Sequence, residues 1–155
     1  MRPLAAGGVF RDRWWKVSIV LWLPLTLLVV ATAVDLRRRE VPDSVSIALL
    51  GWAVIATALG WSPNGWPSLL FGLACGLAIG IVLFALGAFG GGDAKLIAAL
   101  GAVLGPQAFL VFLFYVAIAG GVFALVAAAR GKSELAYAPA ITLGFLTVIV
   151  TRGAW

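Results

Sequence analysis

Two acidic residues are placed where an apolar chain could carry chemistry. The sequence has only six Asp and Glu residues, and Asp35 and Asp93 are the two that lie at the end of an apolar segment or in a loop that interrupts one. Ionisable groups at such positions are costly in a bilayer and therefore indicate a functional site. Two carboxyl groups within hydrogen-bond reach cannot both ionise cheaply, so one keeps a proton while the other can deprotonate a water that attacks a peptide carbonyl. The pair predicts the chemistry of an aspartic protease.

The order of the apolar segments places these two acids on the same side of a membrane. One apolar segment ends at Asp35 and another ends just before Asp93, and two expected crossings, 45–61 and 68–89, lie between them. An even number of crossings returns the chain to the side it left, whichever way the protein is inserted. The two carboxyl groups are therefore expected to meet at one edge of the membrane.

A glycine-rich segment surrounds the second acid, in the order Gly90, Gly91, Gly92, Asp93, Ala94 and Lys95. Glycines allow backbone conformations closed to other residues and leave room for an extended peptide, although a plain turn is the alternative. Lys95 could stabilise the carboxylate or bind substrate, but a lysine at a helix start is more often an interface anchor. The segment lacks the Gly-Lys-Ser/Thr ending of a phosphate loop, which argues against nucleotide binding.

The composition restricts the class of protein. Apolar residues make up 63% of the chain and charged residues 11%, against roughly 45–50% and 25% in a soluble domain, which predicts a membrane protein. The absence of His excludes Ser-His-Asp hydrolysis and His-ligated zinc. The single cysteine, Cys75, excludes an intrachain disulfide and a four-thiolate zinc site. The net charge of +5 is explained by lipid headgroups rather than nucleic acid.

The apolar pattern predicts an all-α, polytopic membrane helix bundle of about six transmembrane helices with a short fourth helix. A basic tail, 1–16, precedes a membrane domain, 17–155. The expected helices are 17–34, 45–61, 68–89, 96–104, 109–129 and 135–150. The fourth is only about 14 Å long and needs shelter from protein or a water-filled cavity. The charged stretch 35–44, interrupted by Pro42, is expected to face water.

Helix 68–89 carries three glycines at four-residue spacing, Gly72, Gly76 and Gly80. Such a stripe of small residues lets the backbone of a neighbouring helix approach closely within a membrane. The stripe predicts close helix packing.

Several of these features together resemble the type IV prepilin peptidases, aspartic membrane proteases of the GxGD class. The resemblance covers roughly residues 20–150 and rests on Asp35 followed by Val41-Pro42, on the glycine-rich segment around Asp93, and on 137–140 (Tyr-Ala-Pro-Ala) entering the last helix. It implies that Asp35 and Asp93 are the two catalytic aspartates and that Gly90 and Gly92 are the glycines of the motif. It implies no metal or cofactor.

The resemblance also implies a substrate and a location. These enzymes cleave a short basic leader from prepilin, after a glycine, at the cytoplasmic face of the bacterial inner membrane, while the hydrophobic segment of the pilin lies in the bilayer. Larger members carry a cysteine-rich insertion and N-methylate the new amino terminus. With one cysteine and little room for that insertion, this chain is expected to be a peptidase without methyltransferase, similar to those of tight-adherence (Flp-type) pilus systems.

Some features leave alternatives open. Asp43 stands where the family usually has Asn, and we expect it to cap the following helix through its side chain rather than to join the catalytic pair. Basic residues number six on the catalytic side and five on the other, so charge does not decide the orientation. A non-enzymatic transporter or pilus-assembly scaffold is the alternative function, and a peptidase of the same class with other signal-anchored substrates is a third. The oligomeric state is left open.

Overall fold

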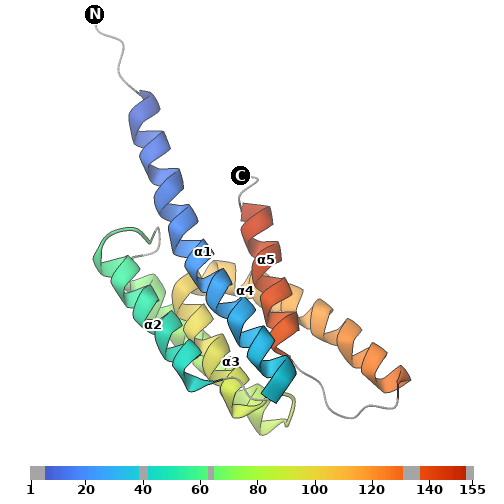
Figure 1. Cartoon of the computed structure of the whole chain (residues 1–155). Helices are drawn as coiled ribbons and strands as arrows, with labels where there is room; N and C mark the ends of the chain where they lie inside the picture. The colour runs from blue at the N-terminus through green and yellow to red at the C-terminus, as the bar shows by residue number, and fades with distance from the viewer. Residues whose placement is uncertain (1–5, 39–41, 63–64, 131–136, 153–155) are drawn as a thin grey trace, which may run out of the picture.

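Five helices make up the fold (Figure 1). The computed structural model describes residues 6–38, 42–62, 65–130 and 137–152. The helices are α1 (Ala6–Arg38), α2 (Asp43–Ala58), α3 (Trp66–Ala85), α4 (Gly91–Ala129) and α5 (Ala138–Arg152). Within α1, α3 and α4 lie segments long and apolar enough to cross a membrane, and α2 and α5 are shorter apolar helices. The predicted all-α membrane bundle is thus present in outline, whereas the count of six crossings is not confirmed.

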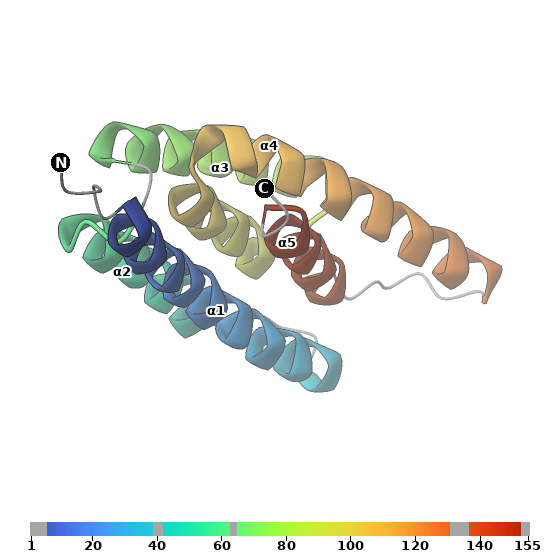
Figure 2. The same cartoon turned by 90° about the horizontal axis from the view of Figure 1, so that it is seen from above.

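The helix α4 is broken at the position that the sequence indicated. Gly105 has φ 71° and ψ 166° and is followed by Pro106, so α4 consists of a first part, 91–104, and a second part, 106–129. Every residue from Leu96 to Gly105 is buried. Seen from above, the first part lies between α3 on one side and α1 and α2 on the other (Figure 2). The short helix therefore has the protein shelter that its length required.

The glycine stripe on α3 packs against the first part of α4, as predicted. A Cβ added to Gly76 would lie 2.8 Å from the carbonyl oxygen of Ile97, and one added to Gly80 would lie 2.7 Å from that of Ala94. Gly72 meets the backbone of Gly101 in the same way. Because backbone faces backbone along the whole stripe, α3 fixes the position of the start of α4.

The helix α1 is longer at both ends than the expected 17–34. It begins at Ala6, inside the segment expected as a tail, and continues to Arg38. The prediction that 35–44 is entirely a water-facing loop is therefore wrong, because Asp35 lies within the helix and is buried. Between Pro24 and Pro42 the sequence contains no residue that interrupts a helix, and Leu and Arg propagate one well.

Two helices end before their predicted ends, and for the same reason. The helices α2 and α3 stop at Ala58 and Ala85 rather than at Trp61 and Phe89. In α3, the Gly87 N–H donates to the carbonyl of Phe84 (2.9 Å) and the Ala88 N–H to that of Leu83 (2.9 Å), and Gly87 has φ +71°. Gly60 has φ +65° and completes the same motif after α2. These are Schellman motifs, in which glycine takes the left-handed conformation and satisfies the last carbonyls.

The core lies where α1, α2, both parts of α4 and α5 meet. Its largest side chains are Phe109, Phe112 and Phe145, with ring centroids 5.8 Å apart for the first pair and 6.4 Å for the second. Many large apolar side chains of α3 and of the second part of α4 are exposed on the outside of the bundle, including Phe71, Phe114 and Leu125. Many exposed large apolar side chains of this kind suit lipid rather than water.

Candidate active site

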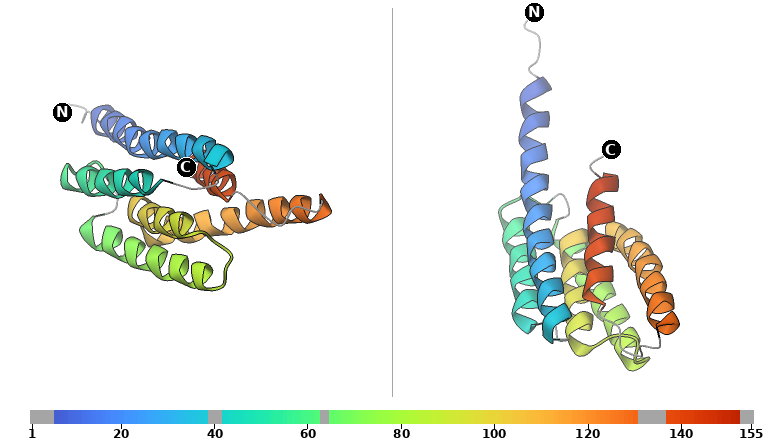
Figure 3. Two further views of the ribbon diagram at one scale, coloured as in Figure 1. Left: turned by 60° about the horizontal axis from the view of Figure 1, so that its bottom comes forward. Right: turned by 45° about the vertical axis from the view of Figure 1, so that its right-hand side comes forward.

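Both predicted acids lie at the same end of the bundle. Asp35 is in the last turn of α1 and Asp93 is in the first turn of α4. The end of α1 and the starts of α4 and α5 gather at the lower end of the right-hand view in Figure 3. The two carboxyl groups are near enough for the charge of Asp35 to act on Asp93. The structure therefore brings together two groups that are far apart in the sequence.

Asp35 is held by a helix that follows it by about a hundred residues. Its side chain is only 6% exposed, and its Oδ2 accepts a hydrogen bond of 3.3 Å from the backbone N–H of Ala138. Ala138 is the first residue of α5 and therefore has one of the N–H groups without a partner inside that helix. The positive end of the α5 dipole also favours a carboxylate there. The start of α5 is thus a preformed cradle for Asp35.

Further hydrogen bonds between α1 and α5 fix this geometry. The hydroxyl groups of Thr32 and Thr142 share a hydrogen bond of 2.7 Å, and Oγ1 of Thr142 lies 3.3 Å from the carbonyl oxygen of Leu28. Leu28, Thr32 and Asp35 follow one another on a single face of α1. Interhelical hydrogen bonds hold helices together in an apolar bundle, so Asp35 has little freedom to move.

Asp93 is held by its own helix. Gly90 is the N-cap residue of α4 and Asp93 is the third helical residue, and the Asp93 carboxyl accepts a hydrogen bond from the backbone N–H of Gly90. This is the side-chain-to-backbone half of a capping box. The other oxygen, Oδ1, is buried and has no hydrogen-bond partner among the residues that the structure describes. Asp93 thus keeps one carboxyl oxygen available for a further partner.

The three glycines before Asp93 have ordinary backbone conformations. Gly90 has φ −73° and ψ 161°, and Gly91 and Gly92 are helical. None of them has a positive φ. The expectation that they supply a conformation closed to other residues is therefore wrong, because a helix start needs no such conformation. A Cβ added to Gly90 would lie 3.5 Å from Oδ2 of Asp93. Glycine at position 90 therefore keeps the space next to this carboxyl group free of a side chain.

Asp43 and Lys95 bind each other beside the site. Lys95 Nζ lies 2.6 Å from Oδ2 of Asp43, and both side chains are 58% exposed. The N-cap residue of α2 is Pro42, whose extended backbone suits that position, and Asp43 is the first helical residue. The expectation that Asp43 caps α2 through its side chain is therefore wrong: the N-cap position belongs to Pro42, and the Asp43 carboxylate is bound to Lys95. The hydrogen bond between Lys95 and Asp43 joins the start of α4 to the start of α2.

Four residues matter to the site in ways that the sequence did not indicate. The N–H of Ala138 binds Asp35, and Gly80 packs against Ala94, next to Asp93. Phe89 and Tyr137, which precede Gly90 and Ala138, have ring centroids 4.9 Å apart. The signal for Ala138 was Pro139, since a proline in a first helical turn marks a helix N-terminus with free N–H groups.

Comparisons with known proteins agree with this arrangement. The profile of the Type IV leader peptidase family matches residues 22–125, a range that contains both Asp35 and Asp93. The chain is 30% identical over 127 residues to the prepilin leader peptidase/N-methyltransferase of Bacillus subtilis (strain 168), an alignment that covers 77% of this chain and 50% of the relative. The protein of the same name from Pectobacterium carotovorum subsp. carotovorum is 28% identical over 163 residues, with 97% and 57% covered.

A third relative of that name, from Neisseria gonorrhoeae, is 30% identical over 153 residues, with 92% of this chain and 52% of the relative covered. The chain spans about half the length of the curated relatives it matches. No solved structure matches it. Since the family profile covers more than half of the 155 residues and includes both acids, the chain belongs to the type IV leader peptidase family.

Proposed function

We propose that this protein is an aspartic endopeptidase that acts at the edge of a membrane, with Asp35 and Asp93 as its catalytic residues. The observation that carries the proposal is that two helix ends bring these carboxyl groups together at one end of an apolar bundle, near enough to interact. Paired carboxyl groups of this kind serve as acid and base in peptide hydrolysis. The family of the chain supports the same activity.

The two environments suggest how the pair works. One carboxyl keeps a proton and donates it toward the peptide carbonyl oxygen, while the other, ionised, takes a proton from the attacking water. When the tetrahedral intermediate collapses, the carboxyl group that took a proton from water passes it to the leaving amine. The other carboxyl group recovers its proton from a hydroxyl group of the intermediate. Because the N-terminus of α5 favours the ionised form of Asp35, we assign the base to Asp35 and the donated proton to Asp93, whose Oδ1 has no partner among the described residues. The bond from Ala138 keeps Asp35 in place throughout.

The proposed substrate is a prepilin with a basic leader and a hydrophobic segment, of the Flp type. The curated relatives are named as prepilin leader peptidases, which supports this class. The proposal includes six crossings of the bacterial inner membrane, with α4 counted as two, and an active site that faces the cytoplasm. It covers hydrolysis and leaves methyl transfer out, so the mass of the processed pilin should show a free amino terminus.

Replacement of each acid tests the activity. Asp35→Asn and Asp93→Asn should each abolish removal of the leader from a co-expressed Flp-type prepilin, measured by immunoblot of membranes. Asp43→Asn is the matched control, because Asp43 is a third carboxylate at the same end and lies outside the pair. If either single variant inserted normally and cleaved the prepilin at the wild-type level, the two-aspartate mechanism would be wrong. The transporter and scaffold alternatives would then have to be reconsidered.

Labelling tests whether both acids face one compartment. In a Cys75→Ala background, cysteines introduced at the exposed positions Leu36 and Gly91 lie beside the two acids, and one at Leu59 marks the far end of α2. A membrane-impermeant thiol reagent added to spheroplasts should label position 59 and spare positions 36 and 91. Labelling of only one of the two positions beside the acids would place them on opposite leaflets and would end the proposal.

A further inference from the structure

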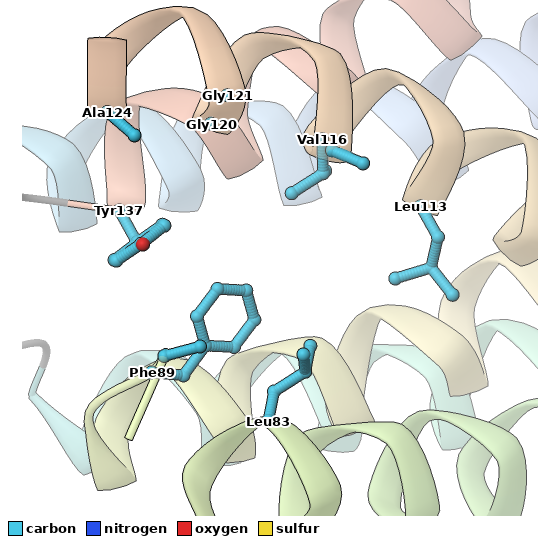
Figure 4. Close-up of a pocket in the computed structure, with 10 residues that line it drawn as sticks. Leu83, Phe89, Leu113, Val116, Gly120, Gly121, Ala124 and Tyr137 are labelled. Carbon is cyan, nitrogen blue, oxygen red and sulfur yellow. The ribbon is translucent and has the colours of Figure 1, made fainter. Parts of the chain in front are cut away.

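An apolar pocket opens beside the candidate active site. Its volume is about 260 Å³, and it lies between the end of α3 with the segment that follows it and the second part of α4 (Figure 4). Leu83 and Phe89 face it from the α3 side, Leu113 and Val116 from α4, and Tyr137 stands at one end. Gly120 and Gly121 carry no side chain where α4 passes the pocket, which leaves the space open.

Two residues of the pocket wall are covalently joined to the groups that hold the acids. Phe89 directly precedes Gly90, whose N–H binds Asp93, and Tyr137 directly precedes Ala138, whose N–H binds Asp35. The two rings meet edge to face with centroids 4.9 Å apart. One wall of the pocket is therefore made by the residues that directly precede the two groups holding the acids.

The size and chemistry of the pocket fit a single side chain. A cavity of 260 Å³ is smaller than the roughly 300–1,000 Å³ of sites that enclose a whole small ligand. Apart from the hydroxyl of Tyr137, the side chains that line it are hydrocarbon. A large apolar side chain would fill it and lose its contact with water, which stabilises binding.

We propose that this pocket binds a large apolar side chain of the peptide substrate, that of the residue directly after the cleaved bond. The inference rests on the proposed function, in which a polar, basic leader precedes the cleaved bond and an apolar segment follows it. From Ala124, at the Tyr137 end of the pocket, to Leu113 at the other end, the lining of α4 runs about 16 Å along the helix, away from the end that leads to Asp35 (Figure 4). We expect the apolar segment of the substrate, which follows the cleaved bond, to continue along the pocket in this direction.

Filling the pocket from Gly121 tests the inference. A Cβ added to Gly121 meets nothing within 4 Å, so larger side chains can be introduced there without a clash at the backbone. Gly51, in the middle of α2 and away from the pocket, is exposed and has equally open surroundings, which makes it the matched control. The series Gly121→Ala, Gly121→Leu and Gly121→Phe is compared with Gly51→Phe, after membrane insertion of each variant has been checked.

The substrates are Flp-type prepilins that differ only in the residue after the cleaved bond, Phe, Leu or Ala. The unmodified enzyme should process the Phe substrate with a kcat/KM roughly tenfold or more above that of the Ala substrate. Gly121→Phe should remove this preference by slowing the Phe and Leu substrates and sparing the Ala substrate, with smaller effects along the series. Gly51→Phe should match the unmodified enzyme.

An equal loss for all three substrates, as expected if the pocket holds a lipid chain, would overturn the inference, and so would unchanged preferences in Gly121→Phe. In either case leader cleavage that depends on Asp35 and Asp93 would leave the proposed function intact. Failure of the unmodified enzyme to process any of the three prepilins would instead reject the proposed function, and this inference with it.

Discussion

Asp35 is at the end of one helix and Asp93 is at the start of another, and their surroundings differ accordingly. Asp35 is buried and bound by the N-terminus of a different helix, α5. Asp93 is only partly buried and is bound by the N-cap residue of its own helix, with one oxygen left over. The comparison teaches that one acid depends on the assembly of the bundle and the other on a local helix start, although the proposed reaction needs both equally.

The largest expected effect tests whether the two acids act as one unit. Asp35→Asn and Asp93→Asn should each lower kcat/KM for prepilin cleavage by at least about a thousandfold, and the double variant should be no worse than either single variant. Single-turnover cleavage by purified protein gives the three values. If the two losses multiplied in the double variant, the acids would contribute independently and would not act as one unit.

A smaller loss of activity is expected from a substitution on α3 that shifts Asp93 and leaves Asp35 in place. In Gly80→Val the new side chain would meet the carbonyl of Ala94, 2.7 Å from the added Cβ, and would move the first turn of α4. A displacement of about 1 Å can cost about a hundredfold in rate, so we expect a fall of that order in kcat with the fold retained. Gly51→Val, where a Cβ meets nothing within 4 Å, is the control and should keep full activity.

Replacing the two acids should have different effects on the free energy of unfolding, although both replacements should abolish activity. Asp35→Ala removes the acceptor for a buried N–H at the start of α5, which should lower the free energy of unfolding by about 1–3 kcal/mol. Asp93→Ala removes only a local capping bond, worth about 1 kcal/mol or less. Thermal unfolding of both variants in detergent measures the difference. Equal losses would show that Asp35 is not what joins α1 to α5 at this end.

The two Schellman glycines offer a comparison between the two ends of the molecule. Gly87→Ala and Gly60→Ala should each destabilise the protein by about 1 kcal/mol, because alanine is strained at positive φ. A Cβ at either position meets nothing within 4 Å, so the strain is in the backbone alone. Gly87 lies in the short connection between α3 and α4, six residues before Asp93, whereas Gly60 lies after α2. Cleavage should therefore slow in Gly87→Ala and stay unchanged in Gly60→Ala.

The smallest effect is expected from the ion pair beside the site. Lys95 and Asp43 are both more than half exposed, and such pairs contribute about 0.2–1 kcal/mol and are screened by salt. Lys95→Ala and Asp43→Ala should therefore keep cleavage close to the unmodified level at low and high salt. A loss in Asp43→Ala as large as that in Asp93→Asn would make Asp43 a member of the catalytic set.

Much of the fold could be predicted because each signal was local. The apolar runs indicated the helices, and Gly105-Pro106 indicated the break in α4. The spacing of Gly72, Gly76 and Gly80 predicted close packing against a neighbouring helix, and the structure identifies that helix as the first part of α4. The ends of α2 and α3 were missed although their signals were also local. Apolar residues continue past Gly60 and Gly87, so hydropathy alone extends both helices beyond the glycine that ends them.

The candidate acids could be named from the sequence, but their surroundings could not. That Asp35 belongs to α1, is buried, and meets Ala138 depends on how α1 packs against α5, and no pattern of single residues encodes a contact 103 positions apart. The same holds for the pairing of Lys95 with Asp43 and of Phe89 with Tyr137. Local patterns indicated which residues could do chemistry, and tertiary packing determined what supports them.

The bond from Ala138 to Asp35 also sets an order of events during biosynthesis. The ribosome makes Asp35 before α5, yet the group that orients the Asp35 carboxyl belongs to α5. A nascent chain that has inserted α1 to α4 has both acids in the membrane and lacks the donor for one of them. Under the proposed mechanism, the pair therefore stays incomplete until α5 has been made and has packed against α1.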